Sequence, residues 1–227
     1  MIKHAYIHIP FCIRKCNYCS FVSGYDIKNK DKYIIALSKE IEHRYKGEIL
    51  DTLYLGGGTP SLLYPEDIER IINLFNINNK TEITIETNPE TVTFEKFQGY
   101  KKLKINRISL GVQTFDNNLL KIINRPHNEQ VIYNAVDIIK KSGFDNISID
   151  LIYGLPNQSL NMFKQDIEKA VKLPIKHISS YGLKIESGSF FGKYPPLDIP
   201  NDEIQSSMYI YLSNFLKIKN FFHYEIS

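Results

Sequence analysis

Three cysteines lie within eight residues of one another near the start of the chain, and the rest of the sequence contains no other thiol. They stand at Cys12, Cys16 and Cys19, so that three residues separate the first pair and two the second. Thiolates this close in one loop can converge on a single inorganic centre. An iron–sulfur cluster is normally held by four cysteines. Three cysteines would therefore leave one iron without a protein ligand.

An iron without a protein ligand can bind a small molecule directly. S-adenosylmethionine suits this position because its amino and carboxylate groups can chelate the iron. An electron passed from the cluster to its sulfonium would break a carbon–sulfur bond and release a 5′-deoxyadenosyl radical. In such chemistry the protein supplies position and electrostatics. The cysteine spacing thus predicts a [4Fe–4S] cluster with S-adenosylmethionine as the second cofactor.

Two other uses of the cysteines are open. A structural zinc site needs four ligands, and here His4 or His8 would have to be the fourth, although neither stands at the usual spacing. A disulfide framework is disfavoured by the odd number of cysteines and by the lack of an apolar leader in the first residues. We therefore expect reduced, metal-bound thiols in a cytoplasmic protein.

Length and composition predict one sizeable globular domain. The chain has 227 residues, of which 43% are hydrophobic, and a net charge of +3. No stretch approaches the roughly 18 unbroken apolar residues of a membrane span. The mild positive charge is spread along the chain, so we expect neither nucleic-acid binding nor a transmembrane segment.

The elements that must position the cysteines alternate between strand and helix. Period-two patterns predict strands at 4–9, 52–55, 82–86, 107–112, 146–152 and 177–183, with a further strand at 222–226. Helical spacing predicts helices at 32–45, 65–76, 94–100, 117–123, 129–142, 160–171 and 202–218. Such alternation favours a parallel sheet with covering helices and right-handed connections. The expected fold is α/β, a partial (β/α)6 barrel, with a linker-like patch at 188–200.

Chemically useful residues recur where the predicted strands end, which is where parallel barrels carry their chemistry. The run Gly56-Gly57-Gly58 would expose backbone to a ligand or make a tight turn. No Lys-Ser/Thr follows it, so a nucleotide P-loop is not supported. Glu86 ends an apolar strand, where it would either pair with Arg107 or a lysine, or receive hydrogen bonds from ribose hydroxyls or an ammonium group.

Three further polar residues complete this set. Gln113 offers a donor and an acceptor at another strand end. Arg125 could bind the cofactor carboxylate with its planar fork. Asp150 falls within a buried pattern and needs a partner. Because they follow successive strands above one cysteine loop, we expect these residues to form one site.

The motifs resemble a known family. Cys12-x3-Cys16-x2-Cys19 is similar to the cluster motif of the radical S-adenosylmethionine superfamily. A narrower resemblance, to the oxygen-independent coproporphyrinogen III oxidase group, is carried by the following segments: Tyr6-x-His8-Ile9-Pro10-Phe11-Cys12, Gly56-Gly57-Gly58-Thr59-Pro60-Ser61, Glu86-x-Asn88-Pro89, Gly111-Val112-Gln113-Thr114-Phe115, Asn124-Arg125-x-His127 and Asp150-Leu151-Ile152-Tyr153-Gly154-Leu155-Pro156.

Within that group the chain resembles the heme-chaperone branch, of HemW type. The oxidases carry a further cysteine two residues after the third cluster cysteine, where this chain has Phe21, and a long extension before the residue equivalent to Tyr6. The resemblance implies that Tyr6, Gly57 and Glu86 contact the cluster-bound S-adenosylmethionine. It also implies that a second set lines the adjoining part of the cofactor pocket: Tyr18, Gly58, Thr59, Gln113, Arg125 and Asp150.

The resemblance implies heme binding and transfer, with heme or a porphyrin, a heme-accepting protein and an electron donor as partners. Radical oxidative decarboxylation of coproporphyrinogen III to protoporphyrinogen IX is the alternative, and a remnant that does neither is a third. Any of six histidines could be a heme ligand by type alone: His4, His8, His43, His127, His177 and His223.

Members of the family continue into a C-terminal domain. We therefore expect residues 1–227 to be the radical S-adenosylmethionine core, with 201–227 leading toward that domain. A helix presenting Met208, Tyr211, Leu212 and Phe215, followed by an unpaired strand, would leave an apolar edge prone to self-association.

Overall fold

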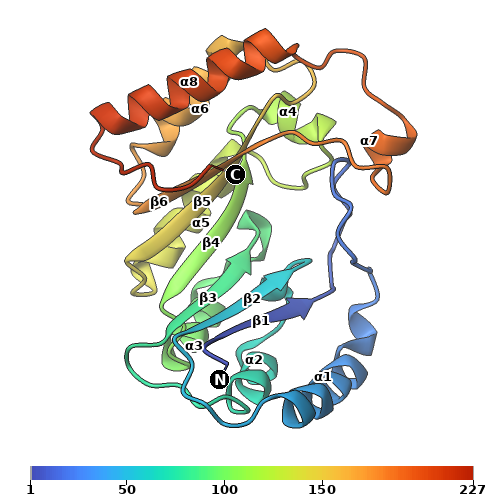
Figure 1. Cartoon of the computed structure of the whole chain (residues 1–227), viewed down its shortest axis with the longest axis vertical. Coiled ribbons are helices and arrows are strands. Elements are labelled where there is room, and N and C mark those ends of the chain that lie inside the picture. Colours follow the sequence, from blue (N-terminus) through green and yellow to red (C-terminus); the bar gives the residue numbers. More distant parts are fainter. Residues whose placement is uncertain (1, 227) are drawn as a thin grey trace.

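A computed structural model of the chain describes residues 2–226. It contains one six-stranded sheet in which every neighbouring pair is parallel and the strand order follows the sequence, β1-β2-β3-β4-β5-β6. The strands are β1 (His4–Ile9), β2 (Thr52–Gly57), β3 (Glu82–Thr87), β4 (Arg107–Gln113), β5 (Asn146–Tyr153) and β6 (His177–Gly182). The sheet curves into an open arc (Figure 1), which confirms the predicted partial (β/α)6 barrel.

Helices connect the strands and cover the convex face of the arc (Figure 1). They are α1 (Lys30–Arg44), α2 (Pro65–Ile72), α3 (Phe94–Lys102), α4 (Asn117–Ile122), α5 (Glu129–Lys141), α6 (Leu160–Ala170), α7 (Phe190–Lys193) and α8 (Asp202–Ile218), with short 3-10 turns η1 (Ile27–Asn29), η2 (Pro60–Leu62) and η3 (Pro89–Thr91). Side chains of Asn128, Ser159 and Asn201 cap α5, α6 and α8 by accepting backbone N–H bonds. Among residues 2–226, no helix combines the length and apolarity needed to cross a bilayer.

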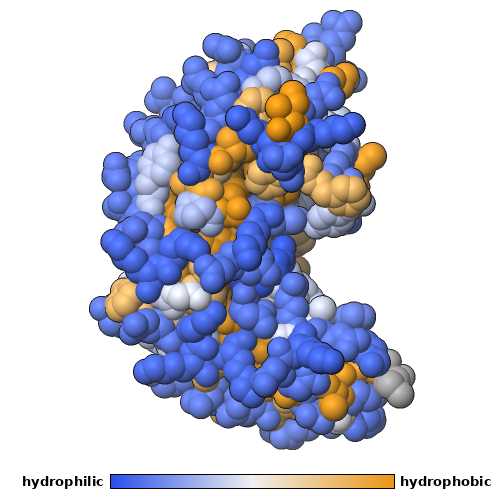
Figure 2. Space-filling view, turned by 90° about the vertical axis from the view of Figure 1, so that its left-hand side faces the viewer, coloured by the Kyte–Doolittle hydropathy of each residue, from blue (hydrophilic) through white to orange (hydrophobic). Residues whose placement is uncertain are grey.

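The two faces of the sheet differ in polarity because side chains alternate along each strand. Leucine and isoleucine side chains such as Leu53, Ile85 and Leu110 are completely buried in the core. The intervening positions carry polar groups, including Ser109 and Ser148, which are also buried. Parallel barrels are usually filled by bulky branched side chains, so the buried hydroxyl groups of this face are a departure from that pattern. Figure 2 shows the resulting crescent, hollowed along one margin.

The C-terminal region corrects two expectations. Residues 222–226 were predicted to form a strand, but they are irregular, and β6 is the edge of the sheet. Their side chains bond to side chains of β6 and α8: Tyr224 lies 2.6 Å from His177, and His223 lies 3.3 Å from Ser213. Side-chain contacts of this kind fix a segment without the backbone ladder that defines a strand.

The apolar face of α8 is largely covered, contrary to expectation. Met208 is completely buried and Leu212 nearly so, because α8 packs against α6 and β5. Tyr211 and Phe215 are half-buried and stack on each other with ring centroids 5.3 Å apart. The exposed apolar side chains of this region lie on other positions of α8, at Ile204, Ile210 and Ile218, and on the final segment, at Phe222, Tyr224 and Ile226. The predicted linker at 188–200 contains the short helix α7.

Candidate functional site

The residues that could bind a cofactor or take part in catalysis lie near the carboxyl ends of β1 to β5. Residues 10–25, named here the cysteine loop, leave β1 and run up the open side of the arc to reach α7 (Figure 1). The backbone of the loop is closed on itself at its base, since Cys12 N–H donates to Gly24 at 2.9 Å and Gly24 N–H donates to Pro10 at 2.7 Å. The thiol-bearing turn is thus held directly above the sheet.

The three cysteines are free and half-buried. Cys19 N–H donates to the Cys16 carbonyl at 3.1 Å, which folds the second half of the motif into a turn. Within residues 2–226, no three His, Cys, Asp or Glu side chains are placed to hold a single metal ion.

Contacts from distant parts of the sequence tether the cysteine loop. The Asn17 N–H donates to Ile123 at 3.1 Å, and its side-chain amide donates to Ile122 at 2.7 Å. Asn124 returns a bond to the Lys15 carbonyl at 2.8 Å. On the other side, Phe191 N–H of α7 donates to the Asn17 carbonyl at 2.9 Å. The loop therefore has defined partners in the segment after α4 and in α7.

A ring of polar contacts joins the cysteine loop to the strand ends. Thr59, just after β2, donates its hydroxyl to the Cys12 sulfur at 3.7 Å. Asn88, just after β3, donates to Thr59 at 3.0 Å and accepts from the Arg125 Nη1 at 2.8 Å. The Arg125 Nη2 donates to the Tyr18 hydroxyl at 3.2 Å, which returns the ring to the cysteine loop. Five side chains or thiols from four parts of the chain are thus fixed relative to one another.

The electrostatics of this ring favour a retained positive charge beside the thiols. Burial opposes the Arg125 charge, but Tyr18, Cys16 and Glu90 outweigh burial and raise the pKa of the guanidinium. Burial disfavours the charged form of Tyr18 as well, which raises the pKa of its phenol, and Tyr18 stays neutral. The Arg125 Nε–H is buried and has no hydrogen-bond partner among the described residues. A buried donor without a partner is costly, so this N–H marks a place for an acceptor from a ligand.

Gly111 of β4 has no side chain, and the space beside it is occupied by three polar side chains from Asn88, Gln113 and Arg125. A Cβ at this position would lie 3.0 Å from Arg125 Nη2, 3.0 Å from Gln113 Nε2 and 3.1 Å from Asn88 Oδ1. Any larger residue would push one of these groups aside. The same strand changes register against β5 between Gly111 and Gln113, and Gln113 adopts a positive φ of 70°. The Gln113 amide is thereby placed with Arg125 and Asn88.

Glu86 lies at the end of β3 and bonds to β2. Its Oε1 accepts from the Tyr54 hydroxyl at 2.9 Å and its Oε2 accepts from the Gly57 N–H at 3.0 Å. Burial raises the pKa of the Glu86 carboxyl, and these two hydrogen bonds partly offset that rise. No ion pair of Glu86 with Arg107 or a lysine occurs in the described part of the chain, so its partners are neutral donors. Tyr6 stacks on Tyr54 with centroids 5.8 Å apart and remains more than half exposed.

The glycine run that follows β2 is shaped by what surrounds it. Gly57 has a φ of +113°, and a Cβ there would lie 2.6 Å from Nδ1 of the His8 ring. That ring is held in place because its Nε2 bonds to the Val22 carbonyl at 2.8 Å. A Cβ at Gly58 would lie 2.6 Å from the Phe11 carbonyl oxygen. Both positions thus require glycine, and bare backbone faces the site there.

Asp150 of β5 lies deeper in the arc. Hydroxyl groups of Ser109, at 3.2 Å, and Ser179 donate to its carboxylate. Burial raises the pKa of Asp150, and these hydrogen bonds together with Arg107 and Arg125 lower it in part. Asp150 in turn raises the pKa of Glu86 through charge repulsion, so two acidic side chains share the inner face.

The structure brings most of the predicted site residues together. Thr59 bonds to Cys12, Tyr18 and Gln113 lie with Arg125, and Tyr6, Gly57 and Glu86 form an adjoining group. Gly58 lies against the base of the cysteine loop, and Asp150 bonds to Ser109 and acts on Glu86 by charge repulsion. Sequence reasoning did not assign Asn88 or Gly111 to the site. Asn88 precedes a proline at a strand end and Gly111 interrupts an apolar strand, which are the signals that could have singled them out.

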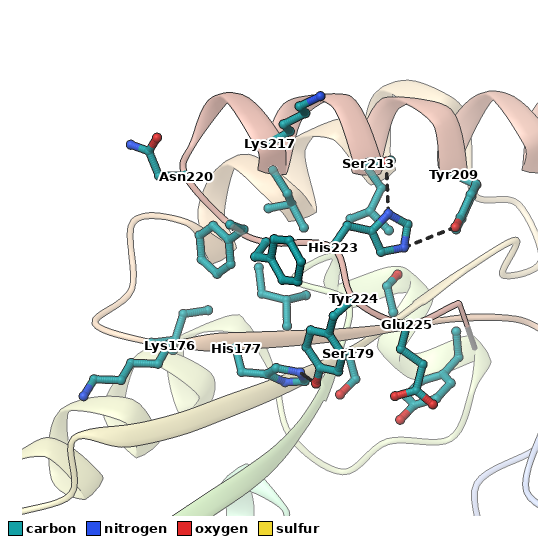
Figure 3. A pocket seen from close by; sticks show the side chains of 18 residues that line it. Lys176, His177, Ser179, Tyr209, Ser213, Lys217, Asn220, His223, Tyr224 and Glu225 are labelled. Carbon is teal, nitrogen blue, oxygen red and sulfur yellow. Dashed lines mark hydrogen bonds between the residues drawn. The ribbon is translucent and has the colours of Figure 1, made fainter.

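The histidines differ in what surrounds them. His127 has a fully buried side chain, with Nδ1 3.0 Å from the Glu90 carboxylate and Nε2 3.4 Å from the Val112 carbonyl, so it has no nitrogen available for heme. His177 and His223 lie at a different place, in a cavity of about 770 Å³ between β6, α8 and the final segment. Figure 3 shows His223 bonded to Tyr209 and Ser213, with His177 beneath Tyr224.

Known proteins resemble this chain over nearly its whole length. The model of the radical SAM superfamily matches residues 6–170. A protein of Lactococcus lactis named heme chaperone HemW is 39% identical over 98% of this chain, and one of Buchnera aphidicola with the same name is 42% identical over 98%. Each match covers 61% of the relative, so the chain spans less than two thirds of these proteins. The solved structure of coproporphyrinogen III oxidase (HemN) from Escherichia coli matches with a TM-score of 0.86 at 28% identity, covering 96% of this chain and 52% of the oxidase.

Proposed function

Because this chain belongs to the radical SAM superfamily, we propose that it binds a [4Fe–4S] cluster and S-adenosylmethionine and acts as a heme chaperone. The observation that carries the proposal is the ring from Cys12 through Thr59, Asn88 and Arg125 to Tyr18, which fixes the thiols against the strand ends. Curated relatives at 39% and 42% identity are named heme chaperones. This chain covers only 61% of those relatives, so heme transfer by this chain is itself part of the proposal.

The residues present fit the two cofactors. Cys12, Cys16 and Cys19 supply three thiolates for a cluster, and four are usual, so one iron is left for S-adenosylmethionine. The Cβ positions of Gly57 and Gly58 are taken by the His8 ring and by the Phe11 carbonyl, so these glycines allow the segment after β2 to pack closely on β1 and the cysteine loop. The buried Arg125 Nε–H is a donor in need of an acceptor, which the carboxylate of the methionine part supplies.

Each protein group then has a definite task. When bound, the cluster supplies an electron and S-adenosylmethionine the carbon–sulfur bond that the electron cleaves. Glu86 holds the Gly57 N–H and keeps a free lone pair for an ammonium or hydroxyl donor, and Tyr6 covers this end of the pocket. Tyr18, Gly58, Thr59, Gln113 and Asp150 line the adjoining part. Thr59 also donates its hydroxyl to the Cys12 sulfur and so helps to orient that side chain.

Heme or a porphyrin is the proposed cargo, a heme-accepting protein and an electron donor are the proposed partners, and the cytoplasm is the proposed compartment. Oxidative decarboxylation of coproporphyrinogen III is the competing function, and it has one specific support: the likeness to the Escherichia coli oxidase at a TM-score of 0.86. Phe21 opposes it, because the oxidases have a further cysteine there and this chain has an exposed aromatic ring.

One experiment separates the two functions. The chain is reconstituted anaerobically with iron and sulfide, and one portion is titrated with heme while absorbance is recorded. A second portion receives coproporphyrinogen III, a reductant and S-adenosylmethionine. We expect saturable heme binding and no protoporphyrinogen. Formation of protoporphyrinogen would overturn the chaperone assignment in favour of catalysis, and absence of cluster absorbance would overturn both.

A further inference from the structure

The end of β4 contains a strained turn that the proposed function does not explain. Gln113 has a positive φ of 70°, and the Thr114 N–H bonds back to the Val112 carbonyl at 3.0 Å. A bond between residues two apart around a positive φ defines a γ-turn of the rare, strained kind. Such backbone is strained and persists only where the surroundings impose it. Something must therefore hold this turn.

Asp166 of α6 is the group that holds it. Its Oδ1 accepts from the Phe115 N–H at 2.7 Å, and its Oδ2 accepts from the Thr114 hydroxyl at 2.8 Å. The Thr114 hydroxyl also accepts from the Asp116 N–H at 3.1 Å. Asp166 is 3% exposed and Thr114 is completely buried. One buried carboxylate thus binds the two residues that directly follow Gln113.

The charges around Asp166 leave it as a carboxylate at neutral pH. Burial raises its pKa to about 6, while its two hydrogen bonds and Lys169 of the same helix act in the opposite direction. From the neighbouring elements, Asp116 repels it, and Glu129 of α5 pairs with Lys169 at 2.7 Å. Tyr133 of α5 also lies within its field.

We propose that Asp166 is a positioning residue that holds the turn at Gln113 and so keeps the Gln113 amide beside Arg125 and Asn88 in the cofactor site. Asp166 does not contact the site itself; it acts through Thr114 and Phe115. The opposing interpretation is that Asp166 only stabilises the packing of α6 against the sheet. If Asp166 positions Gln113, losing its hydrogen bond with Thr114 should lower the affinity for the ligand. If Asp166 only stabilises packing, that affinity should not change. The proposal rests on the proposed function for its ligand.

The test uses a matched pair at Thr114. Thr114→Val keeps the shape and removes the hydroxyl that donates to Asp166, whereas Thr114→Ser keeps the hydroxyl. Both are reconstituted anaerobically, and binding of S-adenosylmethionine is measured beside cluster absorbance. We expect Thr114→Val to bind about tenfold more weakly, the equivalent of one charge-assisted hydrogen bond, and Thr114→Ser to bind nearly as the natural chain does. Equal affinity in both variants, with the cluster retained, would overturn the proposal.

Asp166→Asn gives a second, ligand-free measurement. Its amide oxygen is an uncharged and weaker acceptor for the Phe115 N–H, and its NH2 group replaces the oxygen that accepts from the Thr114 hydroxyl. We expect amide hydrogen exchange at Phe115 to accelerate at least tenfold while β5 amides remain protected. Unchanged exchange at Phe115 would overturn the proposal. If the natural chain binds no S-adenosylmethionine at all, the proposed function fails, and the exchange result alone decides whether Asp166 holds the turn.

The dependence on pH distinguishes positioning from packing. The affinity of the natural chain for S-adenosylmethionine should fall as pH drops below about 6, where Asp166 takes up a proton. The same profile measured for Asp166→Asn should lack this step. A step of equal size in both proteins would assign the pH dependence to another group and count against Asp166.

Discussion

The Glu86 carboxylate accepts a hydrogen bond from the Gly57 backbone N–H at 3.0 Å, which joins the end of β3 to the glycine run after β2. This contact orients the one stretch of the site that has no side chains. Each oxygen of the Glu86 carboxylate accepts one hydrogen bond from the protein, the second one from the Tyr54 hydroxyl, and can accept another from a ligand. The pair therefore shapes the pocket and offers it a charge.

Glu86→Gln should weaken binding of S-adenosylmethionine by about one to two orders of magnitude. The amide cannot accept charge-assisted hydrogen bonds, and losing one is worth roughly 1.5–3 kcal/mol. Cluster content should be unchanged, because Glu86 is not a thiolate neighbour. The measurement is equilibrium binding of S-adenosylmethionine to reconstituted protein. Glu82→Gln, an exposed glutamate at the opposite end of β3, is the control and should bind normally; equal affinities in the two variants would remove Glu86 from the site.

Gly57→Ala should abolish cofactor binding and destabilise the fold more than Gly47→Ala does. Both glycines have a positive φ, which costs an alanine about 1–3 kcal/mol. Only at Gly57 would the new Cβ also meet a neighbour, the His8 ring at 2.6 Å, whereas nothing lies within 4 Å at Gly47. Thermal unfolding of both variants isolates this contact. Equal losses of stability would show that the His8 ring yields and that Gly57 is needed for φ alone.

Cys12→Ser, Cys16→Ser and Cys19→Ser should each prevent stable assembly of an oxygen-sensitive [4Fe–4S] cluster. The chain has three cysteines in all, so no spare thiol can replace a lost ligand. Iron and sulfide content after anaerobic reconstitution, with visible absorbance, is the measurement. Natural protein that retains zinc but neither iron nor sulfide would contradict the prediction.

Protonation of His177 should oppose folding as pH falls below about 6.5, against the opposite contribution of Asp166, whose pKa is raised. Burial, with help from Arg107, lowers the pKa of this imidazole below its ordinary value. Between the lowered value and the ordinary one, near 6.5, the unfolded chain binds a proton that the folded chain does not, so protonation favours unfolding. Denaturant unfolding of the cofactor-free chain at pH 5 to 7 measures the slope.

His177→Gln should remove this contribution and so make the chain more stable at pH 5 relative to pH 7, whereas His43→Gln, on the exposed side of α1, should leave the slope unchanged. Identical slopes in the natural chain and in His177→Gln would assign the pH dependence elsewhere.

The sequence predicted the six strands because each carries a clear apolar period, and it placed Thr59 and Glu86 near strand ends for the same reason. Its placement of Arg125 at a strand end is wrong, because Arg125 follows α4 and joins the site through Asn88 and Tyr18. Asn88 and Gly111 escaped because their roles depend on neighbours from other strands, which periodicity does not record. The γ-turn at Gln113 escaped because it is imposed by Asp166, more than fifty residues away. The pattern at 222–226 fits a strand, but a strand also needs a backbone partner. Here the contacts are made by side chains, between Tyr224 and His177 and between His223 and Ser213.

The tethering of the cysteine loop also sets a schedule for the growing chain. Asn17 bonds to Ile122 and Ile123, more than a hundred residues later, and to Phe191 later still. At a synthesis rate of about 5–20 residues per second, Asn17 of the cysteine loop waits about 5–20 seconds for these partners. A nascent chain stalled before α4 should therefore take up no stable cluster, whereas one stalled after α7 should. Cluster assembly would therefore follow the synthesis of most of the chain, although the three cysteines are synthesised long before α7.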